Sequence, residues 1–190
     1  MTLVGNISKM VVQAASPVTY ALPLNQDLFH LNVFLGKTLK LQFMQQINCV
    51  ACGVSLKKSY QDGYCFPCTQ KLAQTDLCIV KPERCHYHLG TCREPKWGER
   101  HCMVPHVVYL ANASGLKVGI TRKTNIPTRW IDQGAIGALP LFEVLTRRIS
   151  GLVEVVLAKY ISDKTNWRKM LSGVDDSIDL LQERENILAK

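Results

Sequence analysis

The chain has 190 residues, 47% of them hydrophobic, which is enough to bury a core in one large or two small domains and excludes a disordered protein. Its longest nearly uncharged apolar run, residues 134–142, contains Pro140 and is too short to cross a bilayer, and its first residues lack a secretory-signal pattern, so we expect a cytoplasmic protein outside membranes. The formal net charge is +8, and residues 107–170 carry ten basic and four acidic side chains; this excess predicts DNA or RNA as a partner, although a solvated basic surface has the same composition.

Residues 1–48 have the composition of short β-strands. The segments PVTYALPL and LNVFLGKTLKLQFM are rich in strand-forming residues, and LGKT supplies a turn signal between strands. Apolar and polar residues alternate in LKLQF, as in a strand with one buried face. We therefore expect a small N-terminal β-rich region with an antiparallel sheet, to which the sequence assigns no function.

All eight cysteines lie between residues 49 and 102, in a loop-rich region that we expect to span 49–106. The first four form two C-x2-C pairs separated by twelve residues: Cys49, Cys52, Cys65 and Cys68. Each pair fits a tight knuckle with both sulfurs on one side, so two facing knuckles predict a zinc-ribbon-like site for structural Zn2+. A redox pair is the alternative for one C-x2-C, but two copies at ribbon spacing favour zinc.

The second group of cysteines is less regular. We predict a second Zn2+ site formed by Cys78, Cys85, Cys92 and Cys102. A histidine can replace one of these ligands, and the candidates are His86, His101 and His106. Buried thiols beside surface histidines are the alternative. Trp97 suits a lid over the site or a base-stacking surface, and Lys57, Lys58 and Tyr60 between the knuckles suit contacts with phosphates and bases.

Residues 107–190 alternate between strand and helix patterns. The apolar runs VVYL and LKVGIT flank the turn-like NASG and predict two paired strands. We expect a helix around 127–134, a third strand at PLFEVLTRR and another helix from about Ser150. After Ser172 and Gly173, the acidic end predicts a closing amphipathic helix with Ile178 and Leu181 inward, and Ile187 and Leu188 as further candidates. The predicted fold class is α+β.

Four residues in this part have a distinctive order: Tyr109 in VVY, Gly119 in KVG, Arg129 in PTRW and Glu154 in a later helix. This order resembles the core of GIY-YIG endonucleases over about a third of the chain. The resemblance implies a three-stranded antiparallel sheet packed against helices. It also implies that Tyr109 and Arg129 face a scissile phosphate, that Glu154 holds Mg2+ or Mn2+, and that Asn166 in TNW supports the site.

The sequence departs from the GIY-YIG pattern in three places, one of which is the somewhat short spacer of seven residues between the two motifs. The first motif lacks its glycine, and Lys117 stands where the second motif usually has tyrosine. We expect the charge of Lys117 to lower the pKa of Tyr109, so that the pair can deprotonate water. Over its full length, the chain also resembles an uncharacterised bacterial family, a domain of unknown function with cysteine knuckles and the blocks GTCREPKWGE, KVGITR, PTRWIDQGA and DKTNWR.

Two functions are consistent with these features. The first is a metal-dependent nuclease of GIY-YIG type, and the second is a catalytically inactive, zinc-stabilised adaptor that binds DNA or RNA. A purely structural module fits the basic excess less well. The same residues also have non-catalytic readings, with Tyr109 as a core aromatic and Glu154 as an ion-pair partner of Arg129. The nuclease hypothesis requires the Tyr109 hydroxyl, the Arg129 guanidinium and the Glu154 carboxylate to converge.

Overall fold

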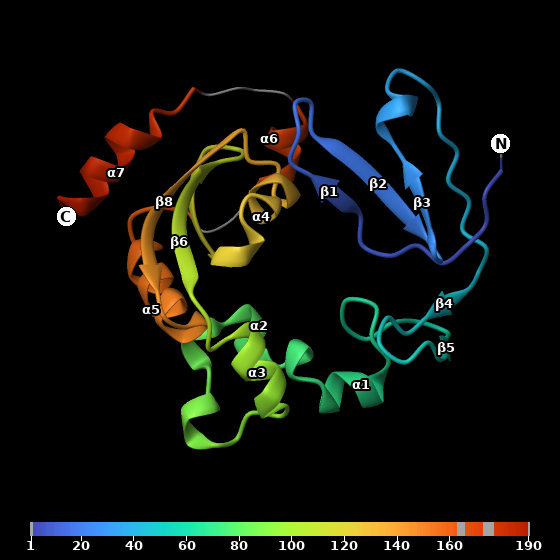
Figure 1. Ribbon diagram of the computed structural model, residues 1–190, viewed down its shortest axis with the longest axis horizontal. Helices are drawn as coiled ribbons and strands as arrows, with labels where there is room; N and C mark the ends of the chain where they lie inside the picture. Colours follow the sequence, from blue (N-terminus) through green and yellow to red (C-terminus); the bar gives the residue numbers. More distant parts are fainter. Residues whose placement is uncertain (1, 163–165, 173–176, 190) are drawn as a thin grey trace. The chain divides into compact units, whose positions relative to one another are not determined.

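The chain folds into two compact units, Met1–Thr75 and Asp76–Lys190. The computed structural model describes residues 2–162, 166–172 and 177–189 (Figure 1). The boundary between the units falls between the two groups of cysteines. Cys49, Cys52, Cys65 and Cys68 therefore belong to the first unit, whereas the other four fold with the second unit.

The first unit begins with the expected antiparallel sheet. Its strands pair in the order β1 (Val11–Gln13), β2 (Thr19–Leu24) and β3 (Asp27–His30), and the 3-10 helix η1 (Asn32–Phe34) follows. The expected strand at LKLQF does not form: residues 38–44 have no regular structure, and Leu41 is 79% exposed. Alternation of apolar and polar residues was insufficient there, because a strand also needs a neighbour to bond its backbone groups.

The four-cysteine segment completes the first unit. Strands β4 (Ile47–Asn48) and β5 (Ser55–Leu56) form a small antiparallel ladder, and the helices α1 (Phe66–Lys71) and η2 (Ala73–Thr75) follow. Pro67 lies in the first turn of α1, where a missing N–H costs no helical hydrogen bond.

The second unit begins with short helices that carry the remaining cysteines. They are α2 (Leu77–Val80), η3 (Pro82–Arg84), η4 (Tyr87–Leu89) and α3 (Pro95–His101). Local signals start them. Asp76 caps α2 by accepting the backbone N–H of Cys78 at 3.1 Å, and prolines occupy the first turns of η3 and α3.

A three-stranded antiparallel sheet forms the centre of the second unit (Figure 1). The middle strand β6 (His106–Asn112) pairs with β7 (Leu116–Arg122) on one side and β8 (Gly137–Val144) on the other. Every residue of β6 is buried, as expected for a strand paired along both edges and covered on both faces. The predicted α+β class is confirmed, and the two runs around NASG form the β6–β7 hairpin.

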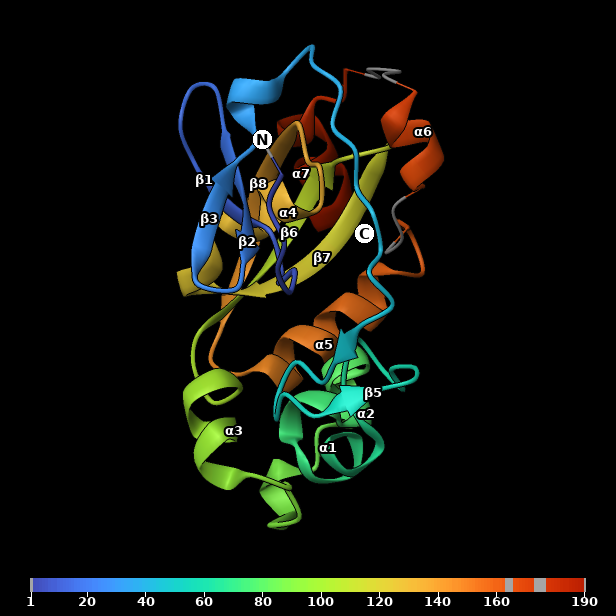
Figure 2. The same ribbon diagram turned by 90° about the vertical axis from the view of Figure 1, so that its right-hand side faces the viewer.

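Helices cover both faces of this sheet. Helix α4 (Thr128–Asp132) and helix α5 (Arg147–Leu157) lie on opposite sides of β6 in Figure 1, and Figure 2 shows the three strands from another side. The 3-10 helix η5 (Lys123–Asn125) precedes α4, and the last helices are α6 (Trp167–Leu171) and α7 (Leu180–Leu188). Of the helices in the described ranges, none is both long and apolar enough to cross a membrane.

The closing helix differs from its prediction. Helix α7 begins at Leu180, where Asp179 caps it by accepting the N–H groups of Leu181 and Gln182. The segment after Ser172 includes residues 173–176, which lie outside the described residues. Of the residues expected inward, Ile187 is 8% exposed and Ile178 is half-buried, whereas Leu181 and Leu188 are 60% and 51% exposed.

Helix α5 connects the sheet to the cysteine-bearing helices. A Cβ at Gly151 would lie 2.6 Å from the Pro82 Cβ, so α5 and η3 approach at a distance that only glycine allows. Arg147 adds two hydrogen bonds, from its backbone N–H to the Cys102 carbonyl at 2.8 Å and from Nη2 to the Ile79 carbonyl at 2.6 Å. These contacts explain why the cysteine region expected at 49–106 is divided between two units.

Helix α5 exposes part of its apolar surface. Its sequence is apolar on nearly every side, yet Leu152, Val155 and Val156 are 44%, 47% and 54% exposed. Ser150 and Gly151 form the buried face instead, because small residues permit the close contact with η3.

Candidate functional site

The first four cysteines form a cluster that could hold a metal ion. Their sulfur atoms all lie within 4.8 Å of one another, and the Sγ atoms of Cys52 and Cys65 are 3.8 Å apart. Two sulfurs bound to one tetrahedral Zn2+ at about 2.3 Å each lie about 3.8 Å apart, which equals the distance between Cys52 and Cys65. The ligand set is the one predicted from the two C-x2-C pairs.

The backbone of each knuckle explains this geometry. Gly53 has a φ of 73° and donates its N–H to the Cys49 carbonyl at 2.9 Å, which closes the first turn. Cys65 stands at the N-terminus of α1, and its N–H donates to the Cys49 sulfur at 3.3 Å. The backbone N–H of Cys52 has the largest effect on Cys49 and helps to lower its pKa to about 6. Four protein ligands leave no open position, so a metal bound here is structural.

The second group of cysteines does not form a comparable cage. Among the described residues, the other group of three or more possible ligands is Asp76, Cys78 and His86, whose ligand atoms lie within 4.8 Å of one another. Cys85 and Cys102 are buried, and Cys92 is half-buried. The predicted site of Cys78, Cys85, Cys92 and Cys102 therefore stays a prediction. Of these four cysteines, only Cys78 belongs to the group with Asp76 and His86.

The two other candidate histidines have different surroundings. His101 Nδ1 bonds to the Trp97 carbonyl at 2.8 Å, and the two rings stack with their centroids 4.2 Å apart. Trp97 thus packs on His101. His106 is fully buried in β6, with Nδ1 bonded to the Val104 carbonyl at 2.7 Å and Nε2 without a hydrogen-bond partner among the described residues. Burial lowers the pKa of His106 to about 4, so its imidazole is neutral at pH 7.

Tyr109 and Lys117 meet at Gln133, which is not among the predicted site residues. The Tyr109 hydroxyl donates to Gln133 Oε1 at 2.7 Å, and Lys117 Nζ donates to the same oxygen at 3.0 Å. Tyr109 is fully buried and Lys117 is 3% exposed. Gln133 ends α4, whose Trp130 ring also packs against Tyr109 with centroids 5.9 Å apart. Nothing in the RWIDQGA segment distinguishes Gln133 from a surface amide.

Gly119 owes its identity to this packing. It pairs directly with Tyr109 across the β6–β7 ladder, and a Cβ at position 119 would lie 2.8 Å from the tyrosine hydroxyl oxygen. The glycine of the KVG motif therefore makes room for the phenol ring.

The charges of Arg129 and Glu154 act on this phenol and amine. Burial raises the pKa of Tyr109, Arg129 opposes the rise by charge and hydrogen bonding, and Glu154 adds to it. Burial also lowers the pKa of Lys117, with Arg129 lowering it further and Glu154 opposing. Arg129 is exposed and Glu154 is half-buried, so this electrostatic network reaches from the sheet interior to the surface.

Burial of Tyr109 argues against its expected role as a base activated by Lys117. The net pKa shift of the phenol is upward and burial is its largest cause, so Tyr109 keeps its proton at neutral pH. A protonated phenol donates a hydrogen bond, as Tyr109 does to Gln133. Burial favours the neutral form of both groups, which the sequence could not show.

Asn166 has a capping role. Its Oδ1 accepts the backbone N–H of Lys169 at 3.2 Å at the start of α6, and its own N–H donates to Ser114 Oγ at 2.9 Å. The next residues form a cation–π pair, with the Arg168 guanidinium carbon 4.8 Å from the Trp167 ring centroid. The structure thus gives Asn166 a local structural explanation.

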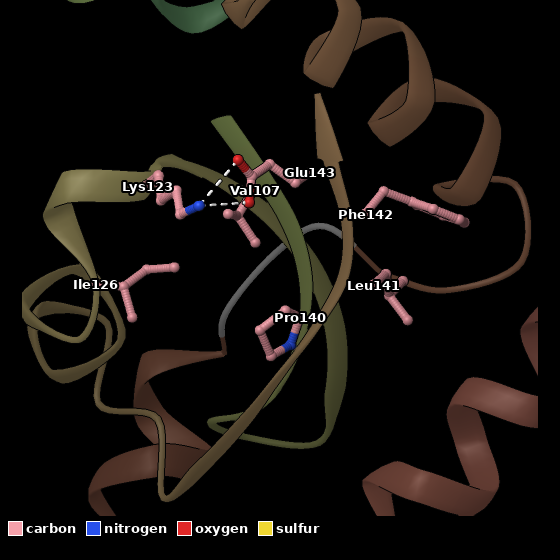
Figure 3. Close-up of a pocket in the computed structure, with 7 residues that line it drawn as sticks. All are labelled: Val107, Lys123, Ile126, Pro140, Leu141, Phe142 and Glu143. Atoms are coloured by element: carbon pink, nitrogen blue, oxygen red, sulfur yellow. Dashed lines mark hydrogen bonds and ion pairs between the residues drawn. The ribbon is translucent and has the colours of Figure 1, made fainter. Parts of the chain in front are cut away.

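A shallow hollow of about 370 Å³ lies beside β6 and β8 (Figure 3). Its lining is mostly apolar and includes Val107, Ile126 and Pro140. The two charged lining residues are paired with each other, because Lys123 Nζ lies 2.8 Å from a Glu143 carboxylate oxygen. The hollow therefore lacks polar groups directed at a ligand, and we assign none to it.

The fold and the cysteine cage define a small α+β protein with a cluster of thiols suited to a metal ion. The chain belongs to the family described as Protein of unknown function (DUF2797), whose model matches residues 36–190. That span contains every cysteine and the Tyr109 network, and it confirms the expected membership of an uncharacterised domain family. No curated protein and no solved structure matches the chain. The family match does not test the GIY-YIG resemblance, which stays a prediction.

Proposed function

We propose that this protein binds DNA or RNA and that its second unit contains a metal-dependent, GIY-YIG-like site for phosphodiester cleavage. The observation that carries the proposal is geometric: the Tyr109 hydroxyl and the Lys117 amine meet at one oxygen of Gln133. The opposite charges of Arg129 and Glu154 also act on both groups. Four chemically different groups from β6, β7, α4 and α5 thus share one locality. Phosphoryl chemistry needs this combination of cation, carboxylate and proton-carrying groups.

Each residue has a role that follows from its environment. The exposed guanidinium of Arg129 would bind the non-bridging oxygens of a phosphodiester. The half-buried carboxylate of Glu154 would hold Mg2+ or Mn2+, ions that commonly bind one or two carboxylates together with substrate phosphate. Such an ion would supply Lewis-acid stabilisation of the leaving oxygen. Tyr109 would orient the phosphate or its water by donating a hydrogen bond.

Gln133 controls access in this proposal. Its Oε1 accepts from both Tyr109 and Lys117, and both of these side chains are buried. A substrate would therefore have to replace one side-chain amide in order to reach the phenol and the amine. Rotation of an amide side chain is a small local change compared with any movement of the sheet.

The same burial favours a second candidate, a zinc-stabilised adaptor that binds nucleic acid without cleaving it. In the adaptor, Gln133 would keep Tyr109 and Lys117 permanently as core groups, and Arg129 would contribute only affinity. The cytoplasmic location that we propose for either function agrees with the eight cysteines, which are all free thiols. The four-cysteine cluster would hold structural zinc in both cases.

Binding tests the part of the proposal that both candidates share. We expect labelled single- and double-stranded DNA and RNA to bind less tightly as salt rises, because phosphate contacts release counterions. Arg129→Gln should weaken binding and reduce the salt slope by about one. The matched control is Arg184→Gln, whose guanidinium already pairs with Glu185 at 2.9 Å in α7. Equal binding by all three proteins would refute the nucleic-acid site.

Cleavage separates the two candidates. With Mg2+ or Mn2+, wild-type protein should cut nucleic acid and Glu154→Gln should not. Glu143→Gln should cut like wild type, because Glu143 pairs with Lys123 and is not among the charges that act on Tyr109 or Lys117. Binding without cleavage in any of the proteins would favour the adaptor. Cleavage that survives Glu154→Gln would reject the proposed site.

A further inference from the structure

A mixed group of possible metal ligands lies at the start of the second unit. Asp76, Cys78 and His86 each offer one ligand atom within 4.8 Å of the other two. The cap of α2 produces part of this arrangement: Asp76 accepts the Cys78 N–H at 3.1 Å, which fixes the carboxylate beside the first turn that carries the thiol. Helix α2 and the 3-10 helix η3 then lead the chain back, so that His86 lies beside Asp76 and Cys78.

The hydrogen-bond partners of His86 permit a tautomer that leaves a lone pair directed at the group. Thr91 Oγ1 donates to the His86 carbonyl at 3.3 Å and lies 2.8 Å from His86 Nδ1. In the tautomer that suits a metal, Nδ1 carries the proton and donates it to Thr91, whose own hydroxyl hydrogen then goes to the His86 carbonyl. In the neutral ring, Nε2 then presents a lone pair, and it lies 3.5 Å from Asp76 Oδ1. Metal-binding histidines are commonly oriented in this way.

The spacing and charge of the group suit a zinc-type ion. Two N or O ligands of a tetrahedral Zn2+ at about 2.05 Å lie about 3.4 Å apart, close to the 3.5 Å between His86 Nε2 and Asp76 Oδ1. Arg93 Nε binds the other carboxylate oxygen of Asp76 at 2.8 Å, which holds the carboxylate in place. Thiolate, imidazole and carboxylate are all ligands that zinc accepts.

One side of this group faces solvent. The side chains of His86 and Arg93 are 30% and 32% exposed, whereas Asp76 is 11% exposed. Three protein ligands occupy three corners of a tetrahedron and leave the fourth for water. The first cluster, with its four cysteines, has no such free position.

We propose that Asp76, Cys78 and His86 bind a second zinc-type ion whose fourth ligand is an exchangeable water molecule. The site differs from the predicted four-cysteine site in two respects, since it uses one thiolate and it remains open. It does not depend on nucleic-acid binding or on cleavage.

Cobalt substitution tests this proposal on the full chain, produced in medium containing Co2+. We expect two Co2+ ions per chain. The thiolate-to-cobalt absorption of the second ion should be roughly a quarter of that of the first, because one sulfur replaces four. Added azide or cyanide should change the visible bands of the second ion and leave those of the first, since only an open position admits a new ligand.

Matched variants identify the ligands. His86→Ala and Cys78→Ser should each reduce the content from two ions to one, whereas His88→Ala and Cys92→Ser should keep two. His88 is exposed and lies in η4, the short helix that His86 precedes. Cys92 is a thiol six residues after His86. The spectrum of the four-cysteine site reports in each variant that the first unit remains folded, and urea denaturation reports the same for the second unit. One ion in wild type, equal thiolate absorption at both ions, or loss of the second ion in Cys92→Ser would overturn the proposal.

Discussion

Tyr109 and Gly119 face each other across the β6–β7 ladder, and the tyrosine ring occupies the space where a side chain at position 119 would begin. A Cβ built on Gly119 lies 2.8 Å from the Tyr109 hydroxyl oxygen and 2.9 Å from the ring carbon that bears it. The hydroxyl itself is held by Gln133. The glycine of one motif thus determines the position of the tyrosine of the other.

Gly119→Ala should therefore displace the Tyr109 ring. Overpacking of this kind costs about 1–3 kcal/mol of unfolding free energy, which urea denaturation can measure. Gly137→Ala in β8 is the matched control, because a Cβ there meets Leu180 at an ordinary 3.4 Å. Equal effects of the two substitutions would contradict the close contact between Gly119 and Tyr109.

Gln133→Leu should destabilise the second unit by about 1–3 kcal/mol, because it removes the acceptor of the buried Tyr109 hydroxyl and one acceptor of Lys117. Urea denaturation gives the change in free energy. Gln182→Leu, at an exposed position of α7, should have little effect. If Gln133→Leu is as stable as wild type, the shared hydrogen-bond acceptor does not hold the network together.

The stability of the second unit should fall in mild acid because of His106. Burial, with Arg147 and Arg122 adding to it, lowers the pKa of His106 from 6.5 to about 4. The imidazole of His106 takes up a proton near pH 6.5 in the unfolded chain and only near pH 4 in the folded chain. The free energy of unfolding therefore has its full value above pH 6.5 and falls as the pH is lowered from 6.5 to about 4. At about 1.4 kcal/mol per pKa unit, the loss approaches about 3 kcal/mol.

Urea denaturation from about pH 7 down to about pH 4, where the folded imidazole takes up its proton, checks the role of His106. We expect His106→Gln to show a weaker dependence of unfolding free energy on pH than wild type. His88→Gln is the control, because His88 is exposed and should leave the slope unchanged. A slope in His106→Gln that equals the wild-type slope would show that this imidazole does not cause the acid sensitivity.

Removal of metal from the cage of Cys49, Cys52, Cys65 and Cys68 should unfold the end of the first unit. Structural zinc sites bind with about 10–16 kcal/mol, which is more than a small unit can lose and remain folded. Cys49→Ser should contain one metal ion fewer and become sensitive to proteolysis within Met1–Thr75. Metal analysis and limited proteolysis measure both effects, and Ser55→Ala on the neighbouring strand is the control. A metal-free protein with wild-type protease resistance would contradict a structural role.

Local patterns in the sequence were sufficient for part of this structure. The C-x2-C pairs identified the four-cysteine cluster, since each knuckle is made by adjacent residues whose backbone geometry is locally determined. The two apolar runs around NASG identified the β6–β7 hairpin for the same reason. The alternating LKLQF segment failed as a strand because its outcome depended on a partner that the local sequence does not supply.

The tertiary structure decided which side chains meet. Gln133 joins Tyr109 and Lys117 although 24 and 16 residues separate it from them, and Asp76 joins Cys78 and His86 through the return of two short helices. The raised pKa of Tyr109 and the lowered pKa of His106 both arise from burial, which depends on every element packed around them. A sequence specifies the types of side chain available, whereas their distances and their exclusion from water exist only once the chain has packed.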